Sequence, residues 1–265
     1  MDAKAIGDER SNGLRASASS EFRRPARTER HFMKESKSVV LLGMLGVFTL
    51  FSLLTAQGEE SRFYIRGDLG GSLTGDSQGS IRGDRNFGFV FGGQNVGLKA
   101  RFDPGERAGV AYGYQITDWF AAEGEIGAIV NEVEGIGLRD GTFASVPFLF
   151  NMKLQYPSHS HWTPYIGAGL GISAGILDAD ILISSSVFNV YQRVHTTGAD
   201  AVFAYQAFAG LRYRLNERMG LSVEYRYLAT EGPSWDLDLG GSTRATLSFG
   251  RIDTHAFSFA FDYRF

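Results

Sequence analysis

The sequence predicts an all-β fold, an eight-stranded antiparallel up-and-down β-barrel that spans a membrane and carries long extracellular loops. Three observations predict it. Apolar and polar side chains alternate along eight segments after residue 62, the last segment is unusually aromatic, and the spacers between segments are alternately short and long. Because successive side chains of a strand point to opposite faces, each segment has one apolar and one polar face.

The last segment shows the alternation most clearly. Its apolar side consists of His255, Phe257, Phe259, Phe261, Tyr263 and Phe265, and small or charged residues stand between them. In a membrane barrel the apolar face contacts lipid and the polar face points into the lumen. This segment is therefore the predicted eighth strand.

Seven earlier segments repeat the pattern. They cover residues 63–73, 110–116, 120–130, 146–156, 166–174, 203–215 and 221–227. No helical periodicity of useful length competes with the two-residue period.

The spacers decide between a membrane barrel and a soluble sandwich. The short ones are Thr117-Asp118, Pro157 to His161 and Asn216 to Arg218, and the long ones are 75–106, 132–142, 176–199 and 230–252. Outer-membrane barrels have short periplasmic turns and longer extracellular loops, whereas a sandwich has no reason to sort its loops in this way. The sequence therefore predicts a protein in the outer membrane of a Gram-negative-type bacterium.

The start of the chain is expected to lie outside the fold. Residues 1–32 are polar and rich in arginine, which predicts a disordered or misassigned extension. Residues 33–56 combine two lysines, an apolar run over 39–54 and a small residue, Ala56, as secretory signal peptides do. The run is shorter than the roughly 20 residues of a transmembrane helix. We expect cleavage after Ala56 and a barrel domain over 57–265.

Charged residues of both signs are predicted to point into the lumen. They are Arg66, Asp68, Glu123, Glu125, Lys153, Arg212, Arg214, Glu224, Arg226, Asp262 and Arg264. Eight strands leave an interior that side chains fill, and an open aqueous pore needs about 16–18 strands. A lone buried ion costs several kcal/mol, so these charges must pair. The sequence predicts a salt-bridged plug, with a narrow ion path that opens when pairs exchange as the alternative.

The sequence also resembles the small outer-membrane β-barrel family, which includes the membrane domain of outer membrane protein A and porin-family barrels. The resemblance lies in 163–171, Gly210–Tyr213, Val223–Tyr227 and Phe261–Phe265. It implies the barrel fold over about 62–265. It also implies that Phe261, Tyr263 and Phe265 form the signal read by the barrel-assembly machinery.

Three functions are compatible with this fold. We expect a non-enzymatic barrel with a structural or surface-interaction role. The alternatives are a narrow porin-like channel for ions or small hydrophobic solutes, and a lipid-modifying outer-membrane enzyme. An enzyme needs a nucleophile and a base within reach, and the third loop offers only His195, Ser184–Ser186, and Asp178 or Asp180 for that purpose.

Cofactors and most partners are not expected. The chain has no cysteine, and His159 and His161 lack a third ligand, so we expect neither a metal nor another cofactor. A formal net charge of −3 without a basic stripe argues against nucleic acid. The expected partners are outer-membrane lipid, lipopolysaccharide and the barrel-assembly machinery. We expect a monomer, and the sequence identifies no extracellular partner.

Overall fold

The computed structural model describes residues 62–265 apart from 88–94, 136–137, 159, 186–189 and 239–242. Residues 1–32 and the predicted signal peptide, 33–56, therefore lie outside the described residues. Within the described part of the chain, no helix is long and apolar enough to cross a membrane.

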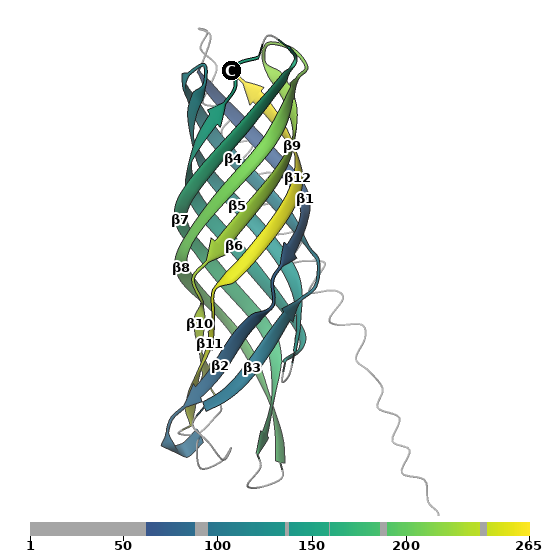
Figure 1. The fold of residues 1–265 in the computed structure, drawn as a ribbon. Helices are drawn as coiled ribbons and strands as arrows, with labels where there is room; N and C mark the ends of the chain where they lie inside the picture. Colours follow the sequence, from purple (N-terminus) through teal and green to yellow (C-terminus); the bar gives the residue numbers. More distant parts are fainter. Residues whose placement is uncertain (1–61, 88–94, 136–137, 159, 186–189, 239–242) are drawn as a thin grey trace, which may run out of the picture. The chain divides into compact units, whose positions relative to one another are not determined.

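Eight strands form a closed antiparallel barrel, and they run at a steep tilt around it (Figure 1). They are β1 (Phe63–Thr74), β4 (Gly105–Thr117), β5 (Phe120–Gly135), β6 (Leu138–Gln155), β7 (Trp162–Ser185), β8 (Val190–Arg214), β9 (Met219–Thr230) and β12 (Ile252–Arg264). The ring closes because β1 pairs with β4 on one side and with β12 on the other, where Leu69 faces Phe259. All eight predicted strands are confirmed.

The short turns gather at one end of the barrel. Trp119 lies in the turn between β4 and β5, residues 156–161 join β6 to β7, and residues 215–218 join β8 to β9. The start of β1 and the end of β12 lie at this same end, which is uppermost in Figure 1. In barrels of this class the short turns face the periplasm.

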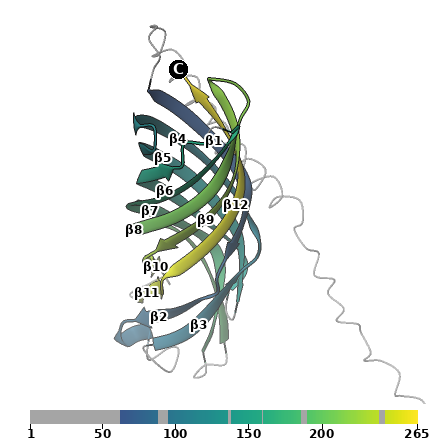
Figure 2. The same ribbon diagram turned by 45° about the horizontal axis from the view of Figure 1, so that its top comes forward.

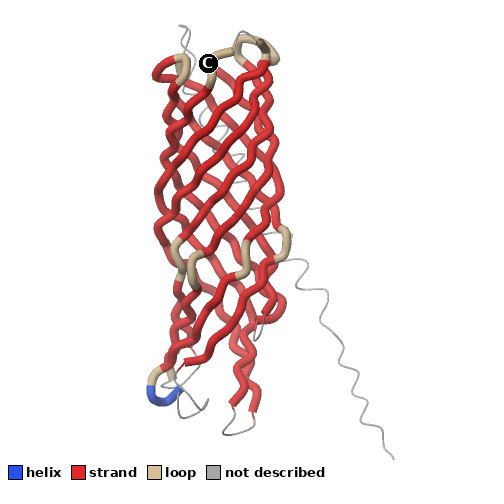
Figure 3. The backbone as a smooth tube through the Cα atoms, viewed as in Figure 1, coloured by secondary structure: helices blue, strands red, loops and turns tan. Residues whose placement is uncertain are grey.

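The long connections contain more regular structure than expected. Two of them build β2 (Ser77–Gly83), β3 (Asn95–Phe102), β10 (Ser234–Asp238) and β11 (Arg244–Phe249), which we call the extension. These strands pair in the order β10-β11-β2-β3 and continue onto β5 (Figure 2). The connections 132–142 and 176–199, expected as loops, are mostly continuations of paired strands. In Figure 3 the described part of these connections is drawn mostly as strand.

The extension shares an apolar core with the adjoining ends of barrel strands β5, β6, β7 and β12. Its buried members are Ile81, Phe87, Leu98, Ala100, Val133, Phe143, Leu177, Trp235, Leu237, Ala245, Leu247, Phe249 and Ile252. The ring of Trp235 meets that of Phe249 at 5.7 Å and that of Phe143 at 6.5 Å, both edge to face. Burying a large apolar side chain stabilises a fold by about 1.5–3 kcal/mol. The long connections fold because they supply such side chains at alternate positions.

A short helical turn links two strands of the extension. The backbone N–H of Phe87 donates to Asp84 Oδ1 at 2.8 Å, and the N–H of Arg244 at the start of β11 donates to Asp84 Oδ2 at 3.2 Å. These donors, the Phe87 N–H above all, hold the pKa of the Asp84 carboxyl below its usual value. Asp84 therefore fastens the end of β2 to β11.

The outer wall of the barrel is apolar while the inside is polar. Exposed wall residues include Leu69, Phe148, Phe150, Met152, Ile166, Leu170, Ile172, Val223, Phe257 and Phe259. Phe259 exposes 76% of its surface, whereas inward-facing Arg66 exposes 2%. A soluble β-sandwich has the opposite arrangement, so this wall is built for lipid.

Truncating a core residue of the extension should loosen the extension and leave the barrel intact. Leu247 is fully buried, and replacing a buried leucine by alanine costs about 2–5 kcal/mol. We expect Leu247→Ala to speed trypsin cleavage of the extension in intact cells. The control is Leu170→Ala, which removes the same atoms from the lipid-facing wall. Equal cleavage rates for the two variants would show that this core does not hold the extension.

Candidate functional site

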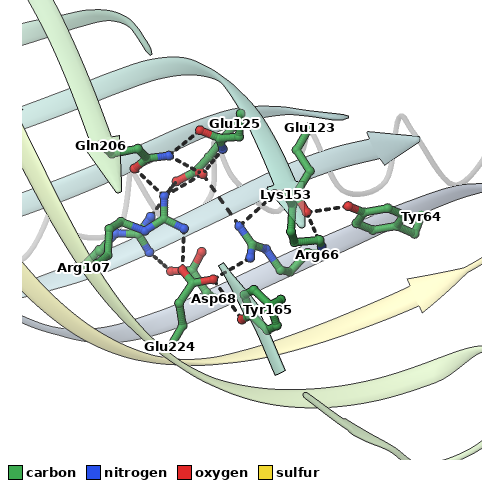
Figure 4. A network of polar contacts seen from close by, with 12 residues as sticks. Tyr64, Arg66, Asp68, Arg107, Glu123, Glu125, Lys153, Tyr165, Gln206 and Glu224 are labelled. Atoms are coloured by element: carbon green, nitrogen blue, oxygen red, sulfur yellow. Dashed lines mark hydrogen bonds and ion pairs between the residues drawn. The ribbon is translucent and has the colours of Figure 1, made fainter. Parts of the chain in front are cut away.

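The lumen is filled by eight buried charged side chains, which we call the charged plug (Figure 4). Its members are Arg66, Asp68, Arg107, Glu123, Glu125, Lys153, Glu224 and Arg226. They come from β1, β4, β5, β6 and β9, at positions that the strand alternation turns inward. Four cations face four carboxylates, so the formal charge of the plug is zero.

Glu125 is the centre of the plug. Its carboxylate accepts hydrogen bonds from Arg107 Nη2 at 2.6 Å and from Arg226 Nη1 at 2.7 Å. Asn151 Nδ2 donates to it at 2.7 Å and Gln206 Nε2 at 3.0 Å. Glu125 lies on β5 and Arg226 on β9, four strands away in a ring of eight. This pair therefore crosses the lumen.

A second set of ion pairs joins β1 to β5 and β9. Arg66 Nη1 lies 2.7 Å from Glu224 Oε2, and Arg66 Nη2 lies 3.2 Å from Glu123 Oε2. Lys153 Nζ on β6 lies 2.5 Å from Glu123 Oε1, and Arg226 Nη2 lies 2.5 Å from Glu224 Oε1. Each of these two carboxylates is thus shared by two cations. The last pair, Arg107 with Asp68, joins β4 to β1.

Aromatic side chains complete the plug. Tyr64 donates to Glu123 at 2.5 Å and Tyr165 donates to Glu224 at 2.9 Å. The Phe208 ring lies under two guanidinium groups, with its centroid 4.9 Å from Cζ of Arg226. A cation over an aromatic face is attracted to it, more strongly where water is excluded.

Glycines on the inner face make room for these large side chains. A Cβ atom at Gly109 would lie 2.7 Å from a carboxylate oxygen of Asp68, and one at Gly113 would overlap the ring of Tyr64. A Cβ at Gly210 would likewise overlap Tyr165. The glycine content of the strands thus complements the plug.

Little space remains beside the plug. On its periplasmic side there is a cavity of only about 10 Å³, lined by Arg66, Lys153 and Tyr165 among others. Such a volume holds about one water molecule. Beyond it, towards the short-turn end, the barrel widens into a cavity of about 1100 Å³, which we call the vestibule.

The structure distributes the predicted lumen charges over three places. Seven of the eleven belong to the plug: Arg66, Asp68, Glu123, Glu125, Lys153, Glu224 and Arg226. Arg212 and Asp262 form a separate ion pair, and the half-buried Arg264 lies beside them. Arg214 lies at the end of β8, outside the plug, and its exposed guanidinium donates to the Ser160 carbonyl at 3.3 Å.

One charged member of the plug, Arg107, lies before the predicted second strand. It belongs to β4 because this strand begins at Gly105, earlier than the sequence predicts. Continuing the alternation back from Gly109 by two residues would have turned Arg107 inward. Asn151 and Gln206 lie on the polar faces of the predicted fourth and sixth strands. The sequence did not show that both donate to the same carboxylate, that of Glu125.

The remaining candidate residues form no recognisable reaction centre in the described part of the chain. Backbone register places Asp180 opposite His195, but the side chains of 179–197 lie outside the described residues. His159 is also outside them, and His161 Nδ1 lies 3.2 Å from the Arg214 carbonyl oxygen. No group of three or more potential metal ligands occurs among the described residues.

The aromatic residues of the predicted assembly signal end β12 at the short-turn end. The rings of Tyr263 and Phe265 meet edge to face at 5.5 Å, and the Phe265 N–H donates to the Phe63 carbonyl at 3.2 Å. Phe261 is partly exposed on the wall. Contact with the assembly machinery stays a prediction.

Neutralising the central carboxylate should destabilise the barrel. Glu125→Gln keeps the shape of the side chain but leaves the plug with one uncompensated positive charge. Breaking a buried ion network in this way costs about 3–5 kcal/mol. We expect a clear fall in the unfolding temperature in detergent.

The matched control for this variant is Glu134→Gln on the same strand, where the side chain is exposed. It should leave the unfolding temperature almost unchanged. If both variants unfold at the same temperature as the wild type, the plug charges are solvated and do not stabilise the barrel.

Comparison with known proteins agrees with this geometry. The family model described as outer membrane protein beta-barrel domain matches residues 43–265. No curated protein sequence matches the chain. The structure of the outer membrane protein OprG from Pseudomonas aeruginosa is similar, with 16% identity and a TM-score of 0.54 over 78% of this chain and 99% of that one.

Two further solved structures also match the chain. Neisserial surface protein A is 13% identical with a TM-score of 0.42, over 77% of this chain and 98% of its own. The outer membrane protease OmpT from Escherichia coli is 11% identical with a TM-score of 0.39, over 80% and 100%. At such identities similarity shows the fold alone. The match over residues 43–265 shows that the chain belongs to the outer membrane protein β-barrel family, whose place is the Gram-negative outer membrane.

Proposed function

We propose that this protein is a non-enzymatic and non-conducting barrel with a structural or surface-interaction role. The observation that carries the proposal is the charged plug, in which four cations and four carboxylates close the lumen. A filled barrel is a rigid base. What it supports is the extension, which stands beyond the lipid-facing wall on the extracellular side.

The outward face of the extension suits contact with other molecules in water. Its exposed residues include Gln78, Ser80, Arg82, Asn95, Lys99, Asp236 and Arg244. Lys99 pairs with Asp76 at 3.0 Å, and Arg82 donates to Asn95 at 3.2 Å, so polar side chains contact one another across this face. A partner that binds here has to match a polar β-surface, whereas lipid and lipopolysaccharide contact the apolar wall.

A narrow channel is the second candidate, because the polar lining continues on the extracellular side of the plug. Thr74 Oγ1 donates to Asn131 at 3.1 Å and lies 3.0 Å from Thr254 Oγ1. Ser145 and Ser173 are hydrogen-bonded at 2.8 Å. Exchange of ion pairs in the plug would connect this lining to the vestibule and open a path for ions.

Conductance separates the two candidates. We expect the purified barrel in planar lipid bilayers to give no steady single-channel current in potassium chloride. The reason is that every plug charge has a partner, and an ion would have to replace one of them. Steady current steps from the wild type, altered in Glu125→Gln but unchanged in Glu134→Gln, would overturn the proposal in favour of the channel.

Attachment tests the interaction role separately. Cells that display the wild type should attach to a surface bearing the partner more strongly than cells that display Leu247→Ala, because that variant keeps the barrel but loosens the extension. Leu170→Ala serves as the control. If all three strains attach equally to every biological surface tested, the interaction role is wrong and the structural role is the one that stands.

A further inference from the structure

The vestibule is a cavity of about 1100 Å³ at the short-turn end of the barrel. The turns that surround it include Thr117, Asp118, Ser158 and Asn216. Its inner end is the plug, since Gln115, Gln155, Arg212 and Arg264 line both the vestibule and the 10 Å³ cavity. It is therefore a closed-ended pocket open to the periplasm, and a solute that enters it is retained at the plug.

Arginine dominates the side chains of the vestibule. Those that line it are Arg62, Arg212, Arg214, Arg218 and Arg264. The acidic side chains of the lining are Asp118 and Glu217, and no ion pair joins either of them to an arginine within the described residues. Of the five arginines, Arg212 alone has a carboxylate partner among those residues, Asp262.

These guanidinium groups have donors to spare. An arginine side chain carries five N–H donors, yet Arg62 gives one to the Ile116 carbonyl at 3.1 Å and Arg214 one to the Ser160 carbonyl at 3.3 Å. Nε of Arg212 and Nε of Arg264 are buried and have no hydrogen-bond partner in the described structure. The ends of the strands position these arginines, and the fold uses only some of their N–H donors.

We propose that the vestibule is a periplasm-facing binding site for a phosphate-bearing anion. Guanidinium groups bind phosphate oxygens through pairs of parallel N–H donors, which gives both strength and geometry. The cavity is large enough for several phosphate groups. This site is independent of the extracellular role, because the plug separates the two ends.

Pyrophosphate titration of the folded barrel in a neutral detergent tests the site. We expect saturable binding by isothermal titration calorimetry that weakens as salt rises, because the arginines are partly exposed. Arg264→Gln and Arg214→Gln should each weaken binding about tenfold, which is about 1.4 kcal/mol. Arg82→Gln, on the extension, should bind as the wild type does. Thermal unfolding of each variant confirms that it is folded, and Arg214 is exposed enough for its replacement to be tolerated.

The same titration in lipid nanodiscs identifies the source of the phosphate. If phosphatidylglycerol weakens pyrophosphate binding relative to phosphatidylcholine, the natural ligand is an anionic lipid headgroup of the inner leaflet. If the two lipids give equal affinity, the ligand is a soluble phosphate compound of the periplasm. The proposal fails if pyrophosphate does not bind saturably, or if Arg264→Gln and Arg214→Gln bind it as well as Arg82→Gln does.

Discussion

The pairing of buried charge inside the barrel is the constraint on which the rest of this structure depends. An ion removed from water costs several kcal/mol unless partners surround it. The plug satisfies this requirement with equal numbers of cations and carboxylates, and its pairs join strands far apart in the sequence. Arg66 and Glu224, for example, are 158 residues apart along the chain. A change in the register of one β-strand would leave a buried charge without its partner. The plug therefore favours the one strand register in which the barrel closes, and it also fills the lumen.

The remaining features of the barrel accommodate that constraint. Glycines on the inner face leave the volume that arginine and tyrosine side chains occupy, as at Gly113 beside Tyr64. The outer face carries the large apolar residues that a soluble protein would bury, because lipid replaces the protein core as their environment. The alternation of side chains along each strand therefore places polar residues in the lumen and apolar residues against lipid.

The two ends of the barrel differ in structure. At the extracellular end the long connections bury Trp235, Leu247 and their neighbours against one another, and so fold into a sheet. At the short-turn end the strands stop, and arginines such as Arg214 and Arg264 line the vestibule. The plug lies between the two ends. Roles at the two ends can therefore differ and can be altered separately.

The sequence by itself determined the fold class, the eight strands and the inward position of seven plug charges, because alternation along a strand is a local property. Only the tertiary structure decided which residues pair: Glu125 binds both Arg107 and Arg226, and Arg214 donates to the Ser160 carbonyl at the short-turn end. It also decided that the long connections fold into an extension. The physical reason is that partners across a lumen, and apolar residues from different loops, meet only when the ring closes, and no local pattern in the chain records which distant residues come together.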